Sequence, residues 1–560
     1  MVRKILTTLT APVRGLHQAA YVLAGLTLAS QALALLRDRL FAHSFGASDV
    51  LDLYYAAFKI PDLVFALVAS LVSAYVLIPR IAGGKREESR ALISQTASFL
   101  FFVGGAACIA LAVFARPVLG AFFPEAMLSP HAEEFVFLAR ILLIQPILLG
   151  LSGIATSVTQ VKRRFTLFAL SPVLYNLGII TGTALLYPLY GLPGIGIGVV
   201  AGAFAHLLIH IPVLAGERLF PRLVVPSPQV LWEVMRDSIP RSLALAMGSV
   251  TALLLTIIAA RLGEGSITVL SLATNLQAVP LSLIAASYAT AAFPVLSESM
   301  EAKKYDAFKA TLSAAARHII FWSAILSVLV LVLRAHIVRI VLGTGAFDWD
   351  ATRITAAILA ILVIGLMAQG LVLLASRAFY AAKRSWNPLA IQLVALVLSV
   401  GGALGLLWLA QAFPGVRYFV EVLLRVEDVP GTGVLFIALG AMLGQVAAGI
   451  LAMLTLRSVA PGVAGSVVRP AFEGAAAAIL GGAAAYGVLS YLGNIAPLTT
   501  LFYVFTEAAI AGMVGLMVAA AVLALLANKE FRDLTDSLRK LRVSTALKPS
   551  GPVLSDRADT

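Results

Sequence analysis

Residues 432–456 read TGVLFIALGAMLGQVAAGILAMLTL, a run of 25 residues without a charged side chain. The hydrocarbon core of a bilayer is about 30 Å thick, and an α-helix needs about 20 apolar residues to cross it. We therefore expect this run to span a membrane. Comparable runs, separated by glycine, proline or clusters of charge, bring the expected number of spans to fourteen. They lie near residues 17–36, 50–79, 94–115, 135–160, 165–187, 191–215, 238–260, 266–296, 313–333, 354–381, 386–410, 432–456, 471–492 and 499–527.

The composition supports a membrane protein rather than a chain of soluble domains. Hydrophobic residues make up 60% of the 560 and charged residues only 12%, which is about half the charged fraction of a soluble protein. The apolar runs leave no length for an autonomous soluble enzyme domain. The basic segment 1–14 is short and lacks the cleavage site of a removable signal peptide. We expect an all-α, polytopic membrane protein with about 14 transmembrane helices.

The distribution of lysine and arginine predicts the orientation of the spans, because translocated loops are depleted of both residues. Of the 41 lysines and arginines, 28 fall on the side that holds both termini, nine fall on the opposite side, and four lie within or beside spans. A miscounted span would reverse every later loop, so this segregation indicates an even number of spans with both termini cytoplasmic. The net charge of +13 is thus explained by topology, and binding of nucleic acid is not expected.

An internal duplication is visible in the first twelve spans. Residues 157–176, SVTQVKRRFTLFALSPVLYN, are similar to residues 376–392, SRAFYAAKRSWNPLAIQ, since each contains a tight Lys-Arg turn followed by a proline-containing span. Spans two and eight match more loosely through Pro61 and Pro280. We expect two pseudo-symmetric six-helix lobes plus two C-terminal helices, an organisation that places transporter sites between repeats. The predicted units are a first lobe (1–222), a second lobe (223–460), the last two spans (461–528) and a basic cytoplasmic tail (529–560).

The tail includes the stretch KEFRDLTDSLRKLR, which begins at Lys529. This stretch is compatible with an amphipathic helix on anionic headgroups and equally with a solvated terminus.

Motifs of enzymes and metal sites are absent from the sequence. There is no GxxxxGK[ST] loop, GxSxG elbow or HExxH pair, so ATP-driven transport by this chain alone is not expected. The single Cys108 excludes a cysteine-based metal site, and the pair His206 and His210 has no nearby carboxylate. We expect no enzymatic activity, no cofactor and no metal, which leaves a secondary transporter or a flippase.

Ionisable groups at membrane depth are costly unless they are paired or hydrated, and they therefore mark candidate sites. Arg37 and Asp38 lie at the end of the first span. Asp52 and Lys59 lie two helical turns apart on the second span, where both can line one face of a cavity. The alternative is structural, because Arg37 can snorkel to the interface and Lys59 can pair with Asp62 or Asp52.

Deeper in the chain, Arg140 and Arg377 occupy corresponding spans of the two predicted lobes. Arg377 is near a Lys-Arg turn, so snorkelling is an alternative for it. Glu507 in the last span needs a partner or a proton, and with Asp38 it is a weak candidate for a coupling residue. Arginines in a central cavity suit an anionic substrate, because a guanidinium donates charge-assisted hydrogen bonds to phosphate.

The stretch LASQALALLRDRLFAHSFGASDVLDLYYAAFKIPDL (28–63) resembles the first two helices of the MurJ/MviN family of lipid II flippases, within the multidrug/oligosaccharidyl-lipid/polysaccharide superfamily. Residues 144–177, 341–359 and 376–391 are similar to further family segments, so the resemblance covers essentially the whole chain. It implies an alternating-access flippase that moves undecaprenyl-diphosphate-linked peptidoglycan precursor from the cytoplasmic to the outer leaflet of the bacterial inner membrane. It also implies that residues 461–528 form a groove for the lipid tail.

By this resemblance, Arg37 matches a family arginine of the central cavity, Asp52 matches the acidic residue that opens the motif of the second helix, and Lys59 matches the end of that motif. The implied partners are a lipid-linked anionic substrate, membrane lipids and enzymes of cell-wall synthesis. Span eleven contains no carboxylate, so a sodium site is not supported. Coupling to the membrane potential or to protons stays open.

The chain departs from the family pattern in the expected cavity. The family has arginines where this chain has Gln31, Phe65 and Asn275, and an acidic residue where it has Ser70. Two alternative functions therefore stay open: export or flipping of another polyprenyl-linked glycan or an amphiphilic small molecule, and a non-transporting membrane scaffold for envelope synthesis. The candidates that would compensate for the missing positive charge are Lys59, Arg140 and Arg377.

Overall fold

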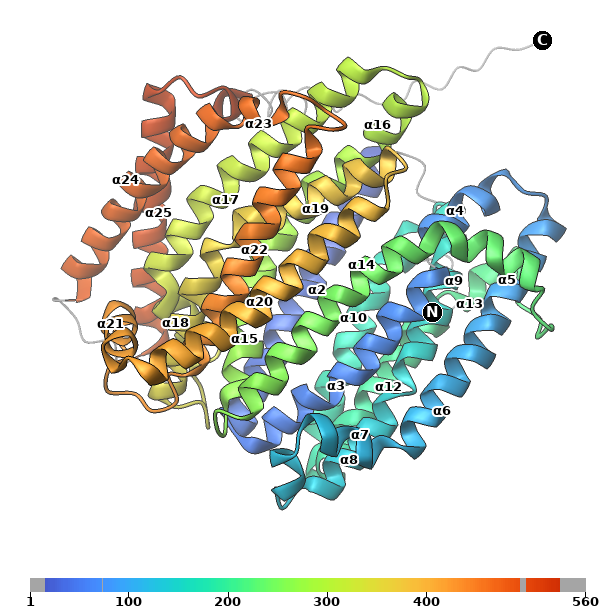
Figure 1. Ribbon diagram of the computed structural model, residues 1–560, viewed down its shortest axis with the longest axis horizontal. Coiled ribbons are helices and arrows are strands. Elements are labelled where there is room, and N and C mark those ends of the chain that lie inside the picture. The colour runs from blue at the N-terminus through green and yellow to red at the C-terminus, as the bar shows by residue number, and fades with distance from the viewer. Residues whose placement is uncertain (1–15, 73, 494–499, 534–560) are drawn as a thin grey trace, which may run out of the picture.

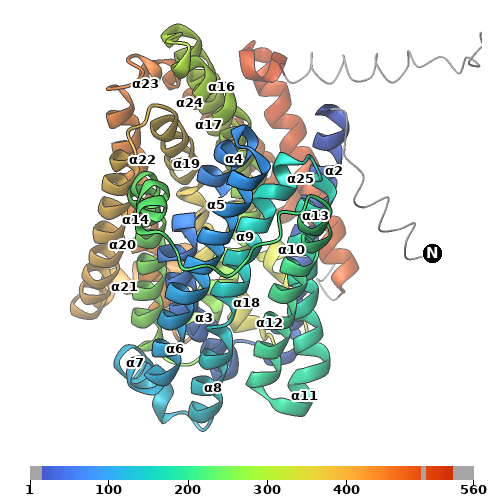
Figure 2. The same ribbon diagram turned by 90° about the vertical axis from the view of Figure 1, so that its right-hand side faces the viewer.

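The computed structural model describes residues 16–72, 74–493 and 500–533, and the regular structure within these ranges is helical (Figures 1 and 2). The first lobe contains α2 (Leu16–Phe45), α3 (Asp49–Leu67), η1 (Ala69–Val72), α4 (Ala74–Gly83), α5 (Arg86–Phe99), η2 (Leu100–Gly104), α6 (Gly105–Val113), α7 (Ala115–Phe122), η3 (Glu125–Leu128), α8 (Ala132–Leu142), α9 (Gln145–Val161), α10 (Phe165–Thr181), η4 (Gly182–Leu186), α11 (Tyr187–Tyr190), α12 (Leu192–Leu208) and α13 (Ile211–Gly216).

The second lobe contains α14 (Pro228–Ala260), α15 (Ser266–Leu281), η5 (Ser282–Ala286), α16 (Ser287–Glu301), α17 (Tyr305–Val341), α18 (Trp349–Ile364), α19 (Leu366–Ala381), α20 (Trp386–Ala412), α21 (Pro414–Leu424) and α22 (Val434–Leu456). The C-terminal helices are α23 (Val463–Ser466), α24 (Val468–Gly493) and α25 (Leu501–Leu525). Most of the predicted basic tail lies outside the described residues.

Length and hydropathy identify eleven membrane spans among the described helices, and twelve if α18 and α19, which meet at a bend of 48°, form one span. The two further expected spans correspond to α2 and to the segment from α3 to α4, which that count does not include. The prediction of an all-α polytopic membrane protein is confirmed. The division into two six-helix lobes stays a prediction, and we use the lobe names for the residue ranges 1–222 and 223–460.

In the described part of the chain, five helix-ending turns contain a lysine or arginine in the left-handed region of the backbone. Arg425 (φ 63°) ends α21, and the other four lie at the opposite end of the bundle. Arg163, Arg218, Lys303 and Lys383 have φ between 53° and 57°, and the next N–H in each turn reaches a carbonyl five residues back at 2.8–3.0 Å. Glycine is usual at this position, but a cation there is favoured by the negative end of the helix dipole. Two of the four, Arg163 and Lys383, belong to the duplicated Lys-Arg turns. We call the end of the bundle with these four turns the basic end.

Prolines interrupt several of the long spans, because a proline inside a helix removes one backbone hydrogen bond. Pro61 lies in α3, which gives way to the 3₁₀ turn η1, and Pro280 lies in α15, which continues into the π-turn η5. Both predicted counterparts, spans two and eight, are thus irregular after their proline. Turns of this type inside membrane helices are tolerated where neighbouring helices cover them.

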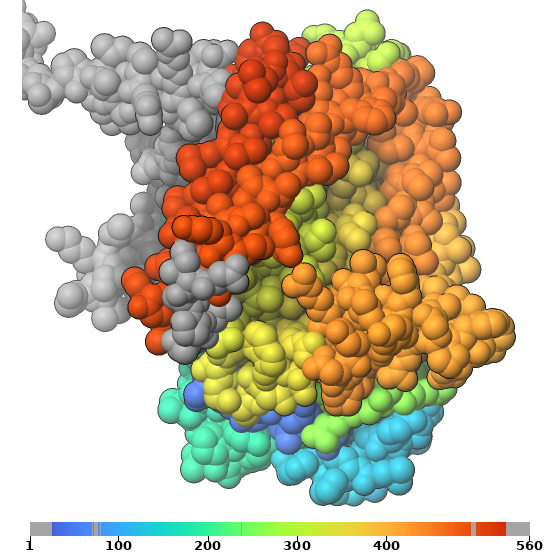
Figure 3. Space-filling model, turned by 90° about the vertical axis from the view of Figure 1, so that its left-hand side faces the viewer, coloured from blue at the N-terminus to red at the C-terminus, as the bar shows by residue number. Residues whose placement is uncertain are grey.

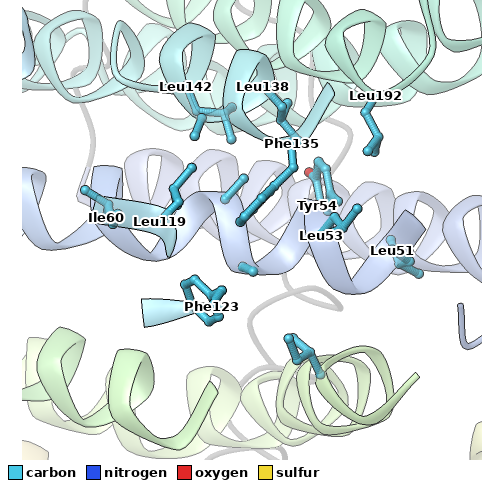
Figure 4. Close-up of a cluster of buried hydrophobic side chains, with 14 of the residues drawn as sticks. Leu51, Leu53, Tyr54, Ile60, Leu119, Phe123, Phe135, Leu138, Leu142 and Leu192 are labelled. Atoms are coloured by element: carbon cyan, nitrogen blue, oxygen red, sulfur yellow. The ribbon is translucent and has the colours of Figure 1, made fainter. Parts of the chain in front are cut away.

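A large buried cluster positions α3 against α7, α8 and α12 (Figure 4). It includes Leu51 of α3 and Phe135 of α8, and Leu255 of α14 belongs to the same cluster. Nearer the basic end, Leu231 of α14 packs on another first-lobe cluster that contains Leu77. Since α14 also packs along α20, it contacts both lobes over much of its length. One face of α3 is therefore packed in the buried cluster, and another face lines the space between the lobes.

Candidate functional site

A cavity of about 450 Å³ lies between the lobes, where side chains of α2, α3 and α10 face those of α14, α15, α19, α20 and α22. Aromatic residues such as Tyr54 and Tyr175 form much of its first-lobe wall. Among the described residues, the charged ones that line it are Arg37, Lys59 and Asp62, all from α2 and α3, whereas the lining residues of the second lobe are neutral.

Two neighbours orient Arg37 in the wall of this cavity. Its Nε and Nη2 donate to Oδ1 of Asp38 at 3.0 and 2.7 Å, and its Nη1 donates to Oδ1 of Asn176 on α10 at 3.2 Å. The Asp38 side chain is only 3% exposed, whereas the Arg37 side chain is 19% exposed. The carboxylate is therefore covered by protein, and the guanidinium keeps access to the cavity.

Amide side chains link the lobes at two positions where the resemblance leads one to look for arginines. Nδ2 of Asn275 on α15 donates to Oδ2 of Asp38 at 3.1 Å. Nε2 of Gln31 on α2 donates to the hydroxyl of Ser282 in η5 at 2.9 Å. Each position thus holds a neutral amide in place of the expected charge, so the positive charge of the described cavity comes from Arg37 and Lys59.

Lys59 and Asp62 lie one helical turn apart on α3 and both line the cavity. Within the described part of the chain, the Lys59 ammonium forms no hydrogen bond or ion pair, although Asp62 is close enough to influence it electrostatically. The alternative in which Lys59 pairs with Asp52 is not observed. Phe65, further along α3, is 40% exposed, and the side chain of Ser70 lies outside those that are described.

Asp52 does not line the central cavity; it contacts the second lobe near the start of α15. Its Oδ2 accepts the N–H of Gly265 at 2.8 Å, and its Oδ1 accepts the N–H and hydroxyl of Thr268 at 2.7 and 2.6 Å. Gly265, with φ +80°, precedes α15 and has no side chain to cap it, so Asp52 supplies the cap from the other lobe. Two helical turns also separate Asp52 from Lys59 by about 10 Å along the axis, which explains their different surroundings.

The second lobe caps a first-lobe helix in return. Oε1 of Glu264 accepts the N–H of Asp49, the first residue of α3, at 3.1 Å. Arg39 donates to the carbonyl of Ile340, in the last turn of α17, at 2.5 Å. The N–H of Ala346 in the α17–α18 loop donates to the carbonyl of His43, in the last turn of α2, at 3.0 Å. These contacts form an interlobe seam at the end opposite the basic end, made by residues 39–52, 261–268 and 340–347.

Two other predicted site residues lie away from the cavity. Arg140 on α8 is exposed, and its Nε donates to the carbonyl of Ala112 at 3.0 Å. The guanidinium of Arg377 on α19 lies over the ring of Phe293, 5.6 Å from its centre. Neither arginine lines the cavity, so the structure does not place them where they would compensate for the missing arginines.

Glu507 on α25 is buried and faces α17, where its Oε2 lies 3.6 Å from Nε2 of His336. The sequence offered no signal for this pair, because a single histidine in an apolar span does not reveal which helix it faces. A coupling role for Glu507 stays a prediction.

The charged residues of the sequence indicated Arg37 and Lys59, but they gave no indication of Asn176 or of the cavity glutamines. Asn176 orients Arg37, and four glutamines line the cavity from four helices: Gln277, Gln369, Gln392 and Gln445. An available signal was the presence of amides within otherwise apolar spans, because burying an amide without a partner is costly.

Comparisons with known proteins agree with this architecture. A family model described as lipid II flippase MurJ matches residues 41–506. The lipid II flippase MurJ of Burkholderia cenocepacia is 25% identical over 401 residues, which cover 69% of this chain and 77% of that relative. The probable lipid II flippase MurJ of Thermotoga maritima is 28% identical over 369 residues, covering 65% of this chain and 73% of that relative.

Two solved structures have a similar fold. A structure of lipid II flippase MurJ in an inward closed conformation has a TM-score of 0.71 at 18% identity, covering 91% of this chain and 100% of that one. An inward-facing multidrug-resistance MATE transporter of the MOP superfamily has a TM-score of 0.62 at 16% identity, covering 80% and 98%. Because the family model spans most of the sequence, this chain belongs to the lipid II flippase MurJ family.

Proposed function

We propose that this protein moves lipid II, the undecaprenyl-diphosphate-linked peptidoglycan precursor, from the cytoplasmic to the outer leaflet of the bacterial inner membrane. The main support is Arg37, whose guanidinium is oriented by Asp38 and Asn176 toward a cavity between the lobes of a MurJ-family chain. A guanidinium oriented in this way suits the oxygens of a diphosphate. The protein is then a transporter rather than an enzyme, with both termini in the cytoplasm.

The interlobe seam supports an alternating-access cycle. In the described state, Asp52 and Glu264 cap helices across the lobes at the end opposite the basic end. When the lobes separate there, water can replace each cap, because helix N-terminal N–H groups are readily satisfied by solvent. The seam can thus open without leaving buried polar groups unpaired. Substrate would enter from the basic end, which the lysine and arginine distribution assigns to the cytoplasm, and leave through the opened seam.

The C-terminal helices suit the lipid tail. Figure 3 shows a hollow between α24 and the α21–α22 region, and α24 exposes large apolar side chains, among them Phe472, Ile479 and Tyr491. We propose that the polyprenyl chain lies along this surface among membrane lipids while the head group crosses between the lobes. Enzymes of cell-wall synthesis are the proposed suppliers and consumers of the substrate. We propose coupling to the membrane potential or to protons, without a cofactor.

The test is mass spectrometry of lipids that remain bound after gentle purification. We expect the wild type to retain an undecaprenyl-diphosphate muropeptide and the Arg37→Ala variant to lose it. Arg140→Ala is the matched control, because it removes an arginine outside the cavity, and it should retain the lipid.

Two results would contradict the assignment. A different polyprenyl glycan on the wild type would favour the alternative of a glycan exporter. Bulk phospholipid alone on all three proteins would contradict substrate binding in the cavity and favour the scaffold alternative.

A further inference from the structure

The two walls of the central cavity differ in chemistry. Its charged residues, Arg37, Lys59 and Asp62, belong to α2 and α3. The second-lobe wall contains amides and hydroxyls without a charged residue among those that line the described cavity. A diphosphate is attracted by the first wall, and the second wall offers it no counter-charge.

Three glutamines of the second wall have side-chain amides without a hydrogen bond in the described part of the protein. Gln369 on α19, Gln392 on α20 and Gln445 on α22 form no hydrogen bond with the described residues, and each is half-buried. Gln369 and Gln445 lie close to each other beside Gly365, at the bend between α18 and α19. A Cβ atom added to Gly365 would lie 3.7 Å from Nε2 of Gln369 and 3.8 Å from Cβ of Gln445.

Gln277, in the same wall, differs from these three because its side chain has a structural role. It is 4% exposed, and its Nε2 donates to the carbonyl of Leu362 at 2.7 Å. That carbonyl is close to the bend where α18 gives way to α19, so Gln277 stabilises a break in the helix. Among the described residues, the amides of Gln369, Gln392 and Gln445 have no comparable hydrogen bond to the backbone.

A glutamine amide offers two N–H donors and a carbonyl acceptor without a charge. Such groups pair well with hydroxyls and amides, which are the polar groups of sugars, acetamido substituents and peptides. Amides from three different helices that share one cavity can contact such a head group at several points. They add little to the attraction of a phosphate, because charge-assisted hydrogen bonds are about twice as strong as neutral ones.

We propose that Gln369, Gln392 and Gln445 form a subsite for the neutral hydroxyl and amide groups of the sugars and peptide in the substrate head group, and that this subsite selects the substrate while Arg37 binds its diphosphate. The inference rests on the proposed function, since it assigns the two walls to two parts of one lipid-linked substrate.

The experiment compares two probes with the same tail and diphosphate: lipid II and undecaprenyl diphosphate, which lacks the sugars and peptide. Binding of each is measured by native mass spectrometry on the full-length protein. The test variant is Gln369→Leu/Gln392→Leu/Gln445→Leu, because leucine has a similar volume. Gln411→Leu is the matched control, since Gln411 is also on α20 but lines a different pocket.

We expect the wild type and Gln411→Leu to bind lipid II more tightly than undecaprenyl diphosphate. The triple variant should lose affinity for lipid II by at least about tenfold, since each lost neutral hydrogen bond accounts for a few-fold. Its affinity for undecaprenyl diphosphate should stay within about twofold, which also shows that it is folded. Equal loss of both probes, or no loss of either, would overturn the subsite. If the wild type binds neither probe, the proposed function itself fails.

Discussion

The interlobe seam and the central cavity both contain charged and polar groups, yet they differ in how those groups are used. In the seam, the Asp52 and Glu264 carboxylates each accept hydrogen bonds from a helix start in the other lobe. In the cavity, Lys59 and three glutamine amides have no hydrogen-bond partner among the described residues. Satisfied groups hold a conformation, whereas unsatisfied groups in a shared cavity are available to a ligand. Arg37 belongs to both classes, because it is oriented by protein and exposed to the cavity.

The largest effect is expected for Arg37→Ala. The variant removes a charge-assisted contact to phosphate, about 1.5–3 kcal/mol or roughly ten- to hundredfold in affinity. It also leaves the buried Asp38 carboxylate without its cation, which costs about 3–5 kcal/mol. Transport of fluorescent lipid II in proteoliposomes should fall to background, and the melting temperature should drop.

The double variant Arg37→Ala/Asp38→Asn separates these two effects. The neutral amide removes the unpaired charge, so the melting temperature should recover while transport stays at background. Recovery of transport together with stability would show that Arg37 is a structural partner of Asp38 rather than a ligand for the substrate.

Asp52→Asn is expected to act on the seam instead of the cavity. The amide cannot accept all three hydrogen bonds from Gly265 and Thr268, and a bond to a charged group contributes about 1.5–3 kcal/mol. The equilibrium should shift toward the open seam, and transport should fall by about tenfold with little change in lipid II affinity.

Spin labels report the seam directly. In a Cys108→Ala background, labels at Leu128 and Trp349, both exposed near the seam end, should show a longer-distance population in Asp52→Asn. Asp428→Asn is the control, because its partner Arg353 belongs to the same lobe. A loss of lipid II affinity with unchanged label distances would instead indicate that Asp52 contacts the substrate.

A smaller effect is expected for Lys59→Gln. Its ammonium lines the cavity without a direct partner in the described chain. Because no neighbouring side chain orients it as Asp38 orients Arg37, we expect it to contribute less, about 0.5–1 kcal/mol or up to about fivefold. The apparent KM for lipid II should rise by two- to fivefold, while kcat changes little.

The double variant Lys59→Gln/Asp62→Asn tests the structural alternative. If Lys59 serves mainly to neutralise Asp62, the second substitution should restore the wild-type KM. If Lys59 contacts substrate, the raised KM should persist.

The fold could be predicted from the sequence to a large extent, because apolar runs and the segregation of lysine and arginine are local or additive signals. Arg37 could be found as a candidate because a charge at membrane depth is conspicuous. The surroundings of Asp52 could not be predicted, since its partners Gly265 and Thr268 lie more than 200 positions away and one of them is a glycine. The cavity glutamines could not be predicted as site residues, because a neutral amide does not interrupt an apolar run and its orientation depends on packing.

The smallest effect is expected for Arg140→Gln, and it tests whether position or charge alone defines the site. Arg140 has the same formal charge as Arg37 and lies in a predicted span, but it is exposed on α8 and bonded to the Ala112 carbonyl. Because it does not line the cavity, its loss should change transport by less than about twofold, within the range of an exposed charge. Proteoliposome transport measured beside Arg37→Ala provides the comparison. A loss as large as that of Arg37→Ala would mean that the substrate path runs along the outside of α8, and the cavity would then no longer explain selection of an anionic lipid.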